Sequence, residues 1–139
     1  MTGELVAALA AEHAAIYGYG VAGAQLTGAT QEAARQAEAA HRTRRDALLV
    51  RLTADGASAP PAEPAYALPF PVTGPVAAAR LGVHLEERAA AVWRRALVAT
   101  TGPTRRLALD ALVDCAVRAT RWRRVAGVSP ATVALPGTP

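Results

Sequence analysis

The sequence contains no lysine and no asparagine, one cysteine, and few aromatic residues. All 15 basic residues are therefore arginines. The single cysteine, Cys115, excludes a disulfide scaffold and a cysteine-based zinc or iron–sulfur site. Aromatic residues make up 4% of the chain, and their scarcity together with that of β-branched residues disfavours a β-sheet protein.

Alanine dominates what is present. The chain has 139 residues, which is the size of one domain, and 36 of them are alanine. Hydrophobic residues make up 52% of the sequence, which excludes a disordered chain because enough apolar surface is available to offset the entropy of ordering. Alanine is also the best helix former. The composition therefore predicts an all-α protein.

The net charge of +4 is modest, because 11 acidic residues are interspersed among the arginines. We interpret most of the basic residues as surface charge, and a nucleic-acid partner as the less favoured hypothesis. The arginines form four local clusters: Arg42, Arg44 and Arg45; Arg94 and Arg95; Arg105 and Arg106; and Arg121, Arg123 and Arg124.

The apolar run from Leu5 to Leu26 is long enough to resemble a membrane span. It contains Glu12, His13 and several other polar residues, so we predict a helix of the fold instead. No signal peptide is recognisable at the start of the sequence. We expect a cytoplasmic protein with no membrane partner.

Four segments carry the periodicity of helices, at about 3–26, 31–54, 75–100 and 104–126. Residues 57–74 contain five prolines and cannot be helical. Residues 1–127 are predicted to form the helical domain, and 128–139 an irregular C-terminal tail. Helices of about 25 residues are roughly 37 Å long, whereas an extended crossover of about 18 residues can reach roughly 60 Å. The second and third helices are therefore predicted to be parallel, as two antiparallel hairpins joined by one long crossover.

Ionisable residues interrupt the apolar stripes of three of the predicted helices. Glu12 lies in the stripe of the first, Glu38 and His41 in that of the second, and Glu86 in that of the third. Burying such groups costs several kcal/mol unless they are paired or bind a metal ion. The spacing therefore predicts a polar centre within the core.

These residues resemble the ferritin-like superfamily over about residues 3–127. The resemblance rests on Glu12, the Glu-x-x-His motif from Glu38 to His41, and Glu86, with Tyr19 matching a tyrosine beside the iron site of ferritins. It implies a four-helix bundle in which these positions hold two iron ions. The Glu12-His13 pair and the segment from His41 to Asp46 are similar to small alanine-rich ferritin-like proteins of actinobacteria, whose function is unassigned.

The fourth helix departs from this pattern. Ferritin-like proteins usually draw a further ligand from it, whereas its predicted inward face is apolar, consisting of Leu109, Leu112, Val113, Ala116 and Ala119. The departure argues against a second iron site.

Two interpretations of the polar centre follow. In the first, Arg45 neutralises Glu12 or Glu86, and His41 and Tyr19 donate hydrogen bonds in a metal-free network. In the second, one or more iron or manganese ions are bound by a ligand set consisting of Glu12, Glu38, His41 and Glu86, with Tyr19 as an outer hydrogen-bond donor.

These interpretations lead to three hypotheses about function. We favour a binding or structural module that is not an enzyme and that self-associates as a homodimer. The alternative is a carboxylate-bridged iron or manganese protein, acting as an oxidoreductase or a metal store. The third is a basic protein associated with nucleic acid, in which Trp122 stacks on bases instead of covering one end of the bundle.

Overall fold

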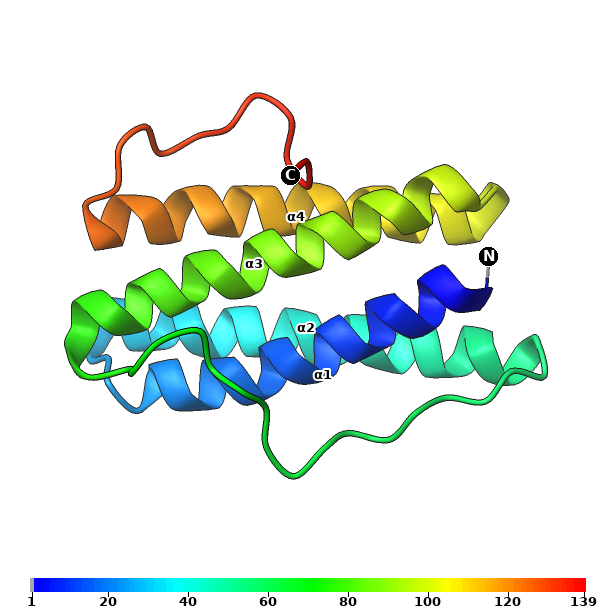
Figure 1. Cartoon of the computed structure of the whole chain (residues 1–139), viewed down its shortest axis with the longest axis horizontal. Coiled ribbons are helices and arrows are strands. Elements are labelled where there is room, and N and C mark those ends of the chain that lie inside the picture. Colours follow the sequence, from blue (N-terminus) through cyan, green and yellow to red (C-terminus); the bar gives the residue numbers. More distant parts are fainter. Residues whose placement is uncertain (1) are drawn as a thin grey trace.

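The computed structural model describes residues 2–139 as a bundle of four α-helices (Figure 1). They are α1 (Thr2–Gly23), α2 (Gly28–Ala54), α3 (Gly74–Ala99) and α4 (Gly102–Ala126). The predicted all-α class is confirmed. α1 ends before Leu26 and α2 begins before Gln31, because Thr27 is extended and Gly28 has a φ of 58°, which together form the turn.

The two hairpins are joined by a long loop over residues 55–73. This loop runs back along the bundle, so α2 and α3 point in the same direction (Figure 1). The connectivity predicted from the lengths of the connections is therefore confirmed. Its physical cause is the run of prolines, which keeps this segment extended and allows it to span the full length of the helices.

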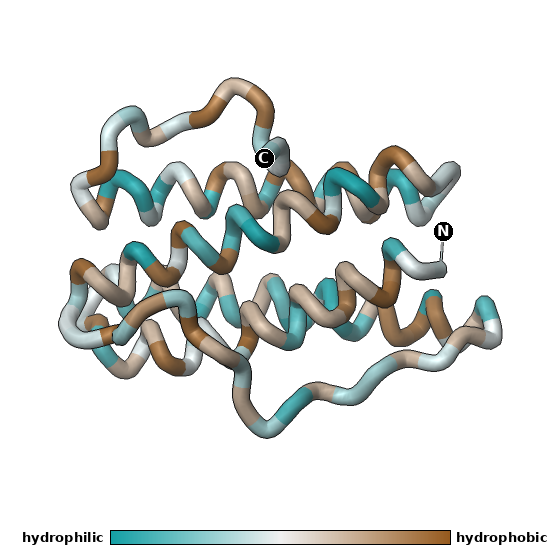
Figure 2. Tube along the Cα trace, viewed as in Figure 1, coloured by the Kyte–Doolittle hydropathy of each residue, from teal (hydrophilic) through white to brown (hydrophobic). Residues whose placement is uncertain are grey.

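The core consists of two hydrophobic clusters, one toward each end of the bundle. One cluster is built around Leu5, Leu9, Leu48, Leu52 and Trp93. The other is built around Tyr19, Leu26, Leu81, Leu85 and Trp122. Fully buried polar residues of α1, α2 and α3 lie between them along each helix. Figure 2 shows hydrophobic and hydrophilic residues interspersed along the helices.

Small residues allow the helices to approach one another closely. A Cβ atom added at Gly18 would lie 2.6 Å from the side chain of Leu85, and one added at Gly82 would lie 2.7 Å from the ring of Trp122. In α1, glycine therefore serves helix packing at Gly18. Gly20 has open space around it and makes no such approach.

α1 is the one helix within residues 2–139 that is long and apolar enough to cross a membrane. Half of its most apolar window is buried inside the bundle. This burial is typical of the core helix of a globular domain.

The tail begins at Gly127, whose left-handed conformation ends α4. Residues 127–139 form no helix or strand and run back over α3 and α4 (Figure 1). The predicted irregular tail is therefore folded onto the bundle.

Candidate functional site

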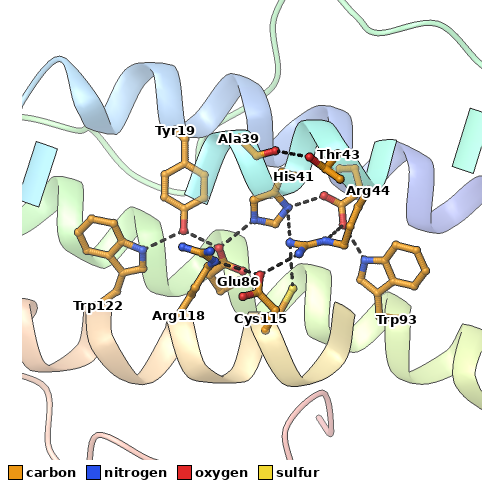
Figure 3. A network of polar contacts seen from close by, with 12 residues as sticks. Tyr19, Ala39, His41, Thr43, Arg44, Glu86, Trp93, Cys115, Arg118 and Trp122 are labelled. Atoms are coloured by element: carbon orange, nitrogen blue, oxygen red, sulfur yellow. Dashed lines mark hydrogen bonds and ion pairs between the residues drawn. The ribbon is translucent and has the colours of Figure 1, made fainter. Parts of the chain in front are cut away.

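The polar centre joins side chains from all four helices (Figure 3). Glu12 of α1, His41 of α2 and Glu86 of α3 are each fully buried. Arg44 of α2 is buried beside them. We call these four residues, together with Asp114 and Arg118 of α4, the ion-pair network.

His41 bridges the two buried carboxylates. Its Nδ1 atom forms a very short contact with Oε2 of Glu12, and its Nε2 atom lies 2.8 Å from Oε1 of Glu86. Both ring nitrogens face carboxylate oxygen atoms, which favours a protonated ring that donates from both, and a terminal nitrogen of Arg44 also lies 3.1 Å from Nδ1. Burial opposes this charge, but the neighbouring carboxylates of Glu86 and Glu12 outweigh it and raise the pKa of His41 to about 9.

Arg44 supplies the second positive charge in the core. Its Nε atom donates to Oε1 of Glu12 over 3.1 Å, and one of its terminal nitrogens donates to Asp114 over 2.8 Å. Burial raises the pKa of Glu12, but the hydrogen bond from His41 and the charges of His41 and Arg44 outweigh it, so the pKa of Glu12 lies below its usual value. Glu12 is therefore ionised and doubly paired.

Asp114 extends the network to the surface. Besides Arg44, it accepts a hydrogen bond from Nε of Arg118 over 2.9 Å. Burial raises its pKa, but these two arginines outweigh that effect and lower it. Three acidic groups (Glu12, Glu86 and Asp114) thus face three cationic groups (His41, Arg44 and Arg118). The network neutralises itself.

Aromatic donors close the two ends of the network. Trp93 donates its indole hydrogen to Oε1 of Glu12 over 2.6 Å. Tyr19 donates to Oε1 of Glu86 over 2.7 Å, and Trp122 donates to the Tyr19 hydroxyl over 2.9 Å. Burial and the Glu86 charge raise the pKa of Tyr19 well above its usual value, so this phenol remains a donor.

One polar atom is left over. Within residues 2–139, Oε2 of Glu86 is the buried side-chain oxygen without a hydrogen-bond partner. Cys115 is also buried in this region, 3.7 Å from a terminal nitrogen of Arg44. Burial and the Glu86 carboxylate raise the pKa of the Cys115 thiol well above its usual value, which makes it a weak nucleophile.

Four of the six residues predicted for the site lie together, namely Glu12, Tyr19, His41 and Glu86. Glu38 does not join them. It accepts a hydrogen bond from Arg42 over 2.6 Å at the bundle surface. A glutamate four residues before an arginine is typical of a surface helix pair, and this signal was present in the sequence.

Arg45, the arginine predicted to neutralise a core carboxylate, does not lie in the polar centre. Its guanidinium pairs with Asp46 over 2.9 Å outside the core, whereas its neighbour Arg44 enters the network. The buried face of α2 steps through Ala34, Ala37, His41, Arg44, Leu48 and Leu52. Glu38 and Arg45, which were predicted for the polar centre, are each one residue away from a buried position, Ala37 and Arg44. A period of 3.6 residues permits steps of three or four, so periodicity alone could not distinguish them.

The predicted inward face of α4 also differs from the face that the structure buries, by a rotation about the helix axis. Leu109 and Val113 are exposed, and the buried residues include Ala108, Ala111 and Cys115. Alanine lines the buried side of α4 because small side chains suit close helix packing. Leu109, Val113 and Val117 lie outside, so the hydrophobic pattern of these residues pointed to the wrong face. The rotation also explains why Asp114 reaches Arg44, a contact that the sequence analysis missed.

The ferritin-like resemblance implies a metal centre, and these residues do not fit one. Both nitrogens of His41 are engaged with carboxylates, so neither has a free lone pair for a metal ion. The guanidinium of Arg44 lies directly against Glu12, and Glu38 lies elsewhere. In residues 2–139, no group of three or more His, Cys, Asp or Glu side chains is arranged to hold a metal ion.

Trp122 is buried at one end of the core and donates to Tyr19. Its ring therefore cannot stack on a nucleobase in this conformation. Several clustered arginines are also engaged within the chain: Arg42 with Glu38, Arg106 with Asp110, and Arg123 with Glu87.

The fold and the site together define a class of protein. It is a small all-α domain whose polar centre balances its own charge. The chain belongs to the family described as Domain of unknown function (DUF4439), whose model matches residues 4–139. It is similar to the conserved hypothetical protein rv2844 from Mycobacterium tuberculosis, an actinobacterium, with 43% sequence identity and a TM-score of 0.86. The match covers 88% of this chain and 94% of that chain. No functionally curated protein matches the chain.

Proposed function

We propose that this chain is a ferritin-like module in which an ion-pair network takes the place of a metal centre, and that it acts as a binding or structural unit. The observation that carries the proposal is the position of Arg44, hydrogen-bonded to both Glu12 and Asp114 in the core. Two buried carboxylates require positive charge nearby. His41 and Arg44 provide it from within the chain.

This arrangement favours a permanent structural role. A metal ion at Glu12 would have to displace Arg44 and take the proton from His41, which the raised pKa of His41 opposes. Buried ion pairs can also fix the register of helices against one another. The network therefore serves to hold α1, α2, α3 and α4 in register, which keeps the outer surface of the module in one arrangement.

Metal analysis of the purified protein, produced in medium supplemented with iron and manganese, tests this proposal. We expect less than about 0.2 ion per chain, since no ligand set is free. Arg44→Met provides the comparison, because it removes the competing charge while keeping an unbranched side chain. Stoichiometric iron or manganese in the unmodified protein would instead establish the carboxylate-bridged metal protein.

Nucleic-acid association is not part of the proposal, because Trp122 is buried and part of the clustered arginine charge is paired. A titration of labelled DNA and RNA at about 50 mM salt measures it. We expect no saturable binding. Saturable binding that weakens steeply with salt would favour the third hypothesis instead.

A further inference from the structure

The tail is attached to the bundle at defined points. Arg123 donates to the carbonyl of Ala131 over 3.1 Å, and Arg94 donates to that of Pro136 over 3.3 Å. Gly137 has a φ of 80°, and a Cβ atom there would lie 2.7 Å from the carbonyl oxygen of Ala90. Only glycine fits this approach without strain. The family model extends through these residues to the end of the tail.

Between these attachments the tail does not pack against the helices. Val133 is 49% exposed and Leu135 is 61% exposed. The segment arches away from α4, as Figure 1 shows. Beneath it lies a hollow of about 710 Å³, with Ala90 of α3 and Ala116 and Ala119 of α4 among its lining residues. Ordering such a segment costs conformational entropy, yet its apolar side chains gain little burial in return.

The hollow contains one deeply buried charged group. The side chain of Arg123 is 6% exposed and lines the hollow. Two of its nitrogens donate to Glu87 and Ala131, which uses two of the five guanidinium hydrogens. A terminal nitrogen of Arg123 lies 2.8 Å from Oε1 of Glu87, so the carboxylate already balances the charge of the guanidinium. The remaining N–H donors of Arg123 therefore suit a neutral acceptor better than an anion.

We infer that the hollow beneath the tail is a binding site for a small, neutral and largely apolar molecule that carries a hydrogen-bond acceptor. The volume lies within the usual range for small-molecule sites, and apolar walls with a few polar groups are typical of them. Arg123 orients the acceptor, and residues 132–135 close over the ligand as a lid. The site is separate from the ion-pair network and does not depend on the absence of metal there.

Fluorescence titration with Nile red, a neutral apolar dye with a carbonyl group, tests this inference. We expect saturable binding with one dye per chain. Ala116→Phe places a ring in the hollow and should weaken binding at least tenfold. Ala11→Phe is the matched control, because Ala11 is also a half-buried alanine within a helix but lines a different hollow, between α1, α3 and the crossover. It should leave the affinity unchanged.

The lid is tested by a second pair of variants. Gly137→Ala should detach the end of the tail and weaken binding several-fold, because the added Cβ meets Ala90. Gly56→Ala introduces comparable backbone strain at a φ of 68° with open space around it, and should not affect the dye. Circular dichroism spectra of all four variants check that each retains its helices.

Three results of the Nile red titrations would overturn the inference. They are an absence of saturable binding to the unmodified protein, equal loss of binding in Ala116→Phe and Ala11→Phe, and unchanged affinity in Gly137→Ala. Tighter binding of the anionic dye 1-anilinonaphthalene-8-sulfonate at the same hollow would also overturn it, because it would show that Glu87 does not balance Arg123.

Discussion

The ion-pair network and the hollow beneath the tail differ in both composition and completeness. The network contains the most reactive-looking side chains of the molecule, but nearly all of their donors and acceptors are used within the chain. The hollow is lined mainly by alanine and tail residues, yet it has volume, exposed apolar side chains and a buried arginine with unused donors. A concentration of ionisable groups can therefore complete a core, whereas an unremarkable apolar surface can remain open to a ligand.

The largest expected effect comes from removing the cation of the network. Arg44→Met should destabilise the fold by about 3–5 kcal/mol, because Glu12 and Asp114 lose a buried partner. Urea unfolding at pH 7 measures the change. Arg45→Met is the matched control, since its partner Asp46 is exposed, and it should cost at most about 1 kcal/mol. Similar losses in both variants would show that Arg44 is not a special partner of the network.

Stability should also depend on pH through His41. Its pKa is about 9 in the folded protein against 6.5 when unfolded, so the folded state binds more protons between these values. The stabilisation is complete below about pH 6.5 and is lost as the pH rises through 9, by up to about 3 kcal/mol. Urea unfolding across this interval measures the slope.

Two substitutions assign the pH dependence to its source. His41→Gln should remove most of the slope, although the variant itself is less stable. His84→Gln should leave it unchanged, because His84 is half-buried at the surface and its pKa is lowered by burial and by the charge of Arg88. Stability that rises between pH 6.5 and 9 in the unmodified protein would contradict the charged state assigned to His41.

An intermediate effect is expected where close packing supports the network. Gly82→Ala pushes a methyl group against Trp122, which donates to Tyr19, and should cost about 1–3 kcal/mol. Gly20→Ala, with open space around it, should stabilise α1 by about 0.5–1 kcal/mol. Thermal unfolding followed by tryptophan fluorescence measures both variants. If Gly82→Ala were neutral, the close approach of α3 and α4 would be less restrictive than the structure indicates.

The smallest effect is expected at the lid of the hollow. Leu135→Ser should change the free energy of unfolding by no more than about 0.5 kcal/mol, because Leu135 is 61% exposed. Chemical unfolding without added ligand measures it. A loss of several kcal/mol would mean that the tail belongs to the packed core, and the contrast with the network would disappear.

The sequence indicated Glu12, His41 and Glu86 because each interrupts an otherwise apolar stripe of its helix, and Tyr19 through the resemblance to ferritins. It failed at Glu38 and Arg45, where a step of three or four residues decides which side chain is buried. It failed again on α4, because its buried face is alanine-rich while Leu109 and Val113 lie outside. In each failure the hydrophobic pattern carried too little contrast to orient the helix.

The sequence by itself determined the four helices, their parallel and antiparallel order, and the presence of a buried polar centre. Helix propensity, proline and glycine boundaries, connection lengths and interrupted stripes are properties of the chain alone. Only the tertiary structure decided that Arg44 balances Glu12, that Asp114 joins them, and that the tail arches over a hollow. Adjacent positions on a helix point about 100° apart. The packing of neighbouring helices therefore selects which of two arginines enters the core, and with it whether a metal ion or the chain's own charge balances the carboxylates.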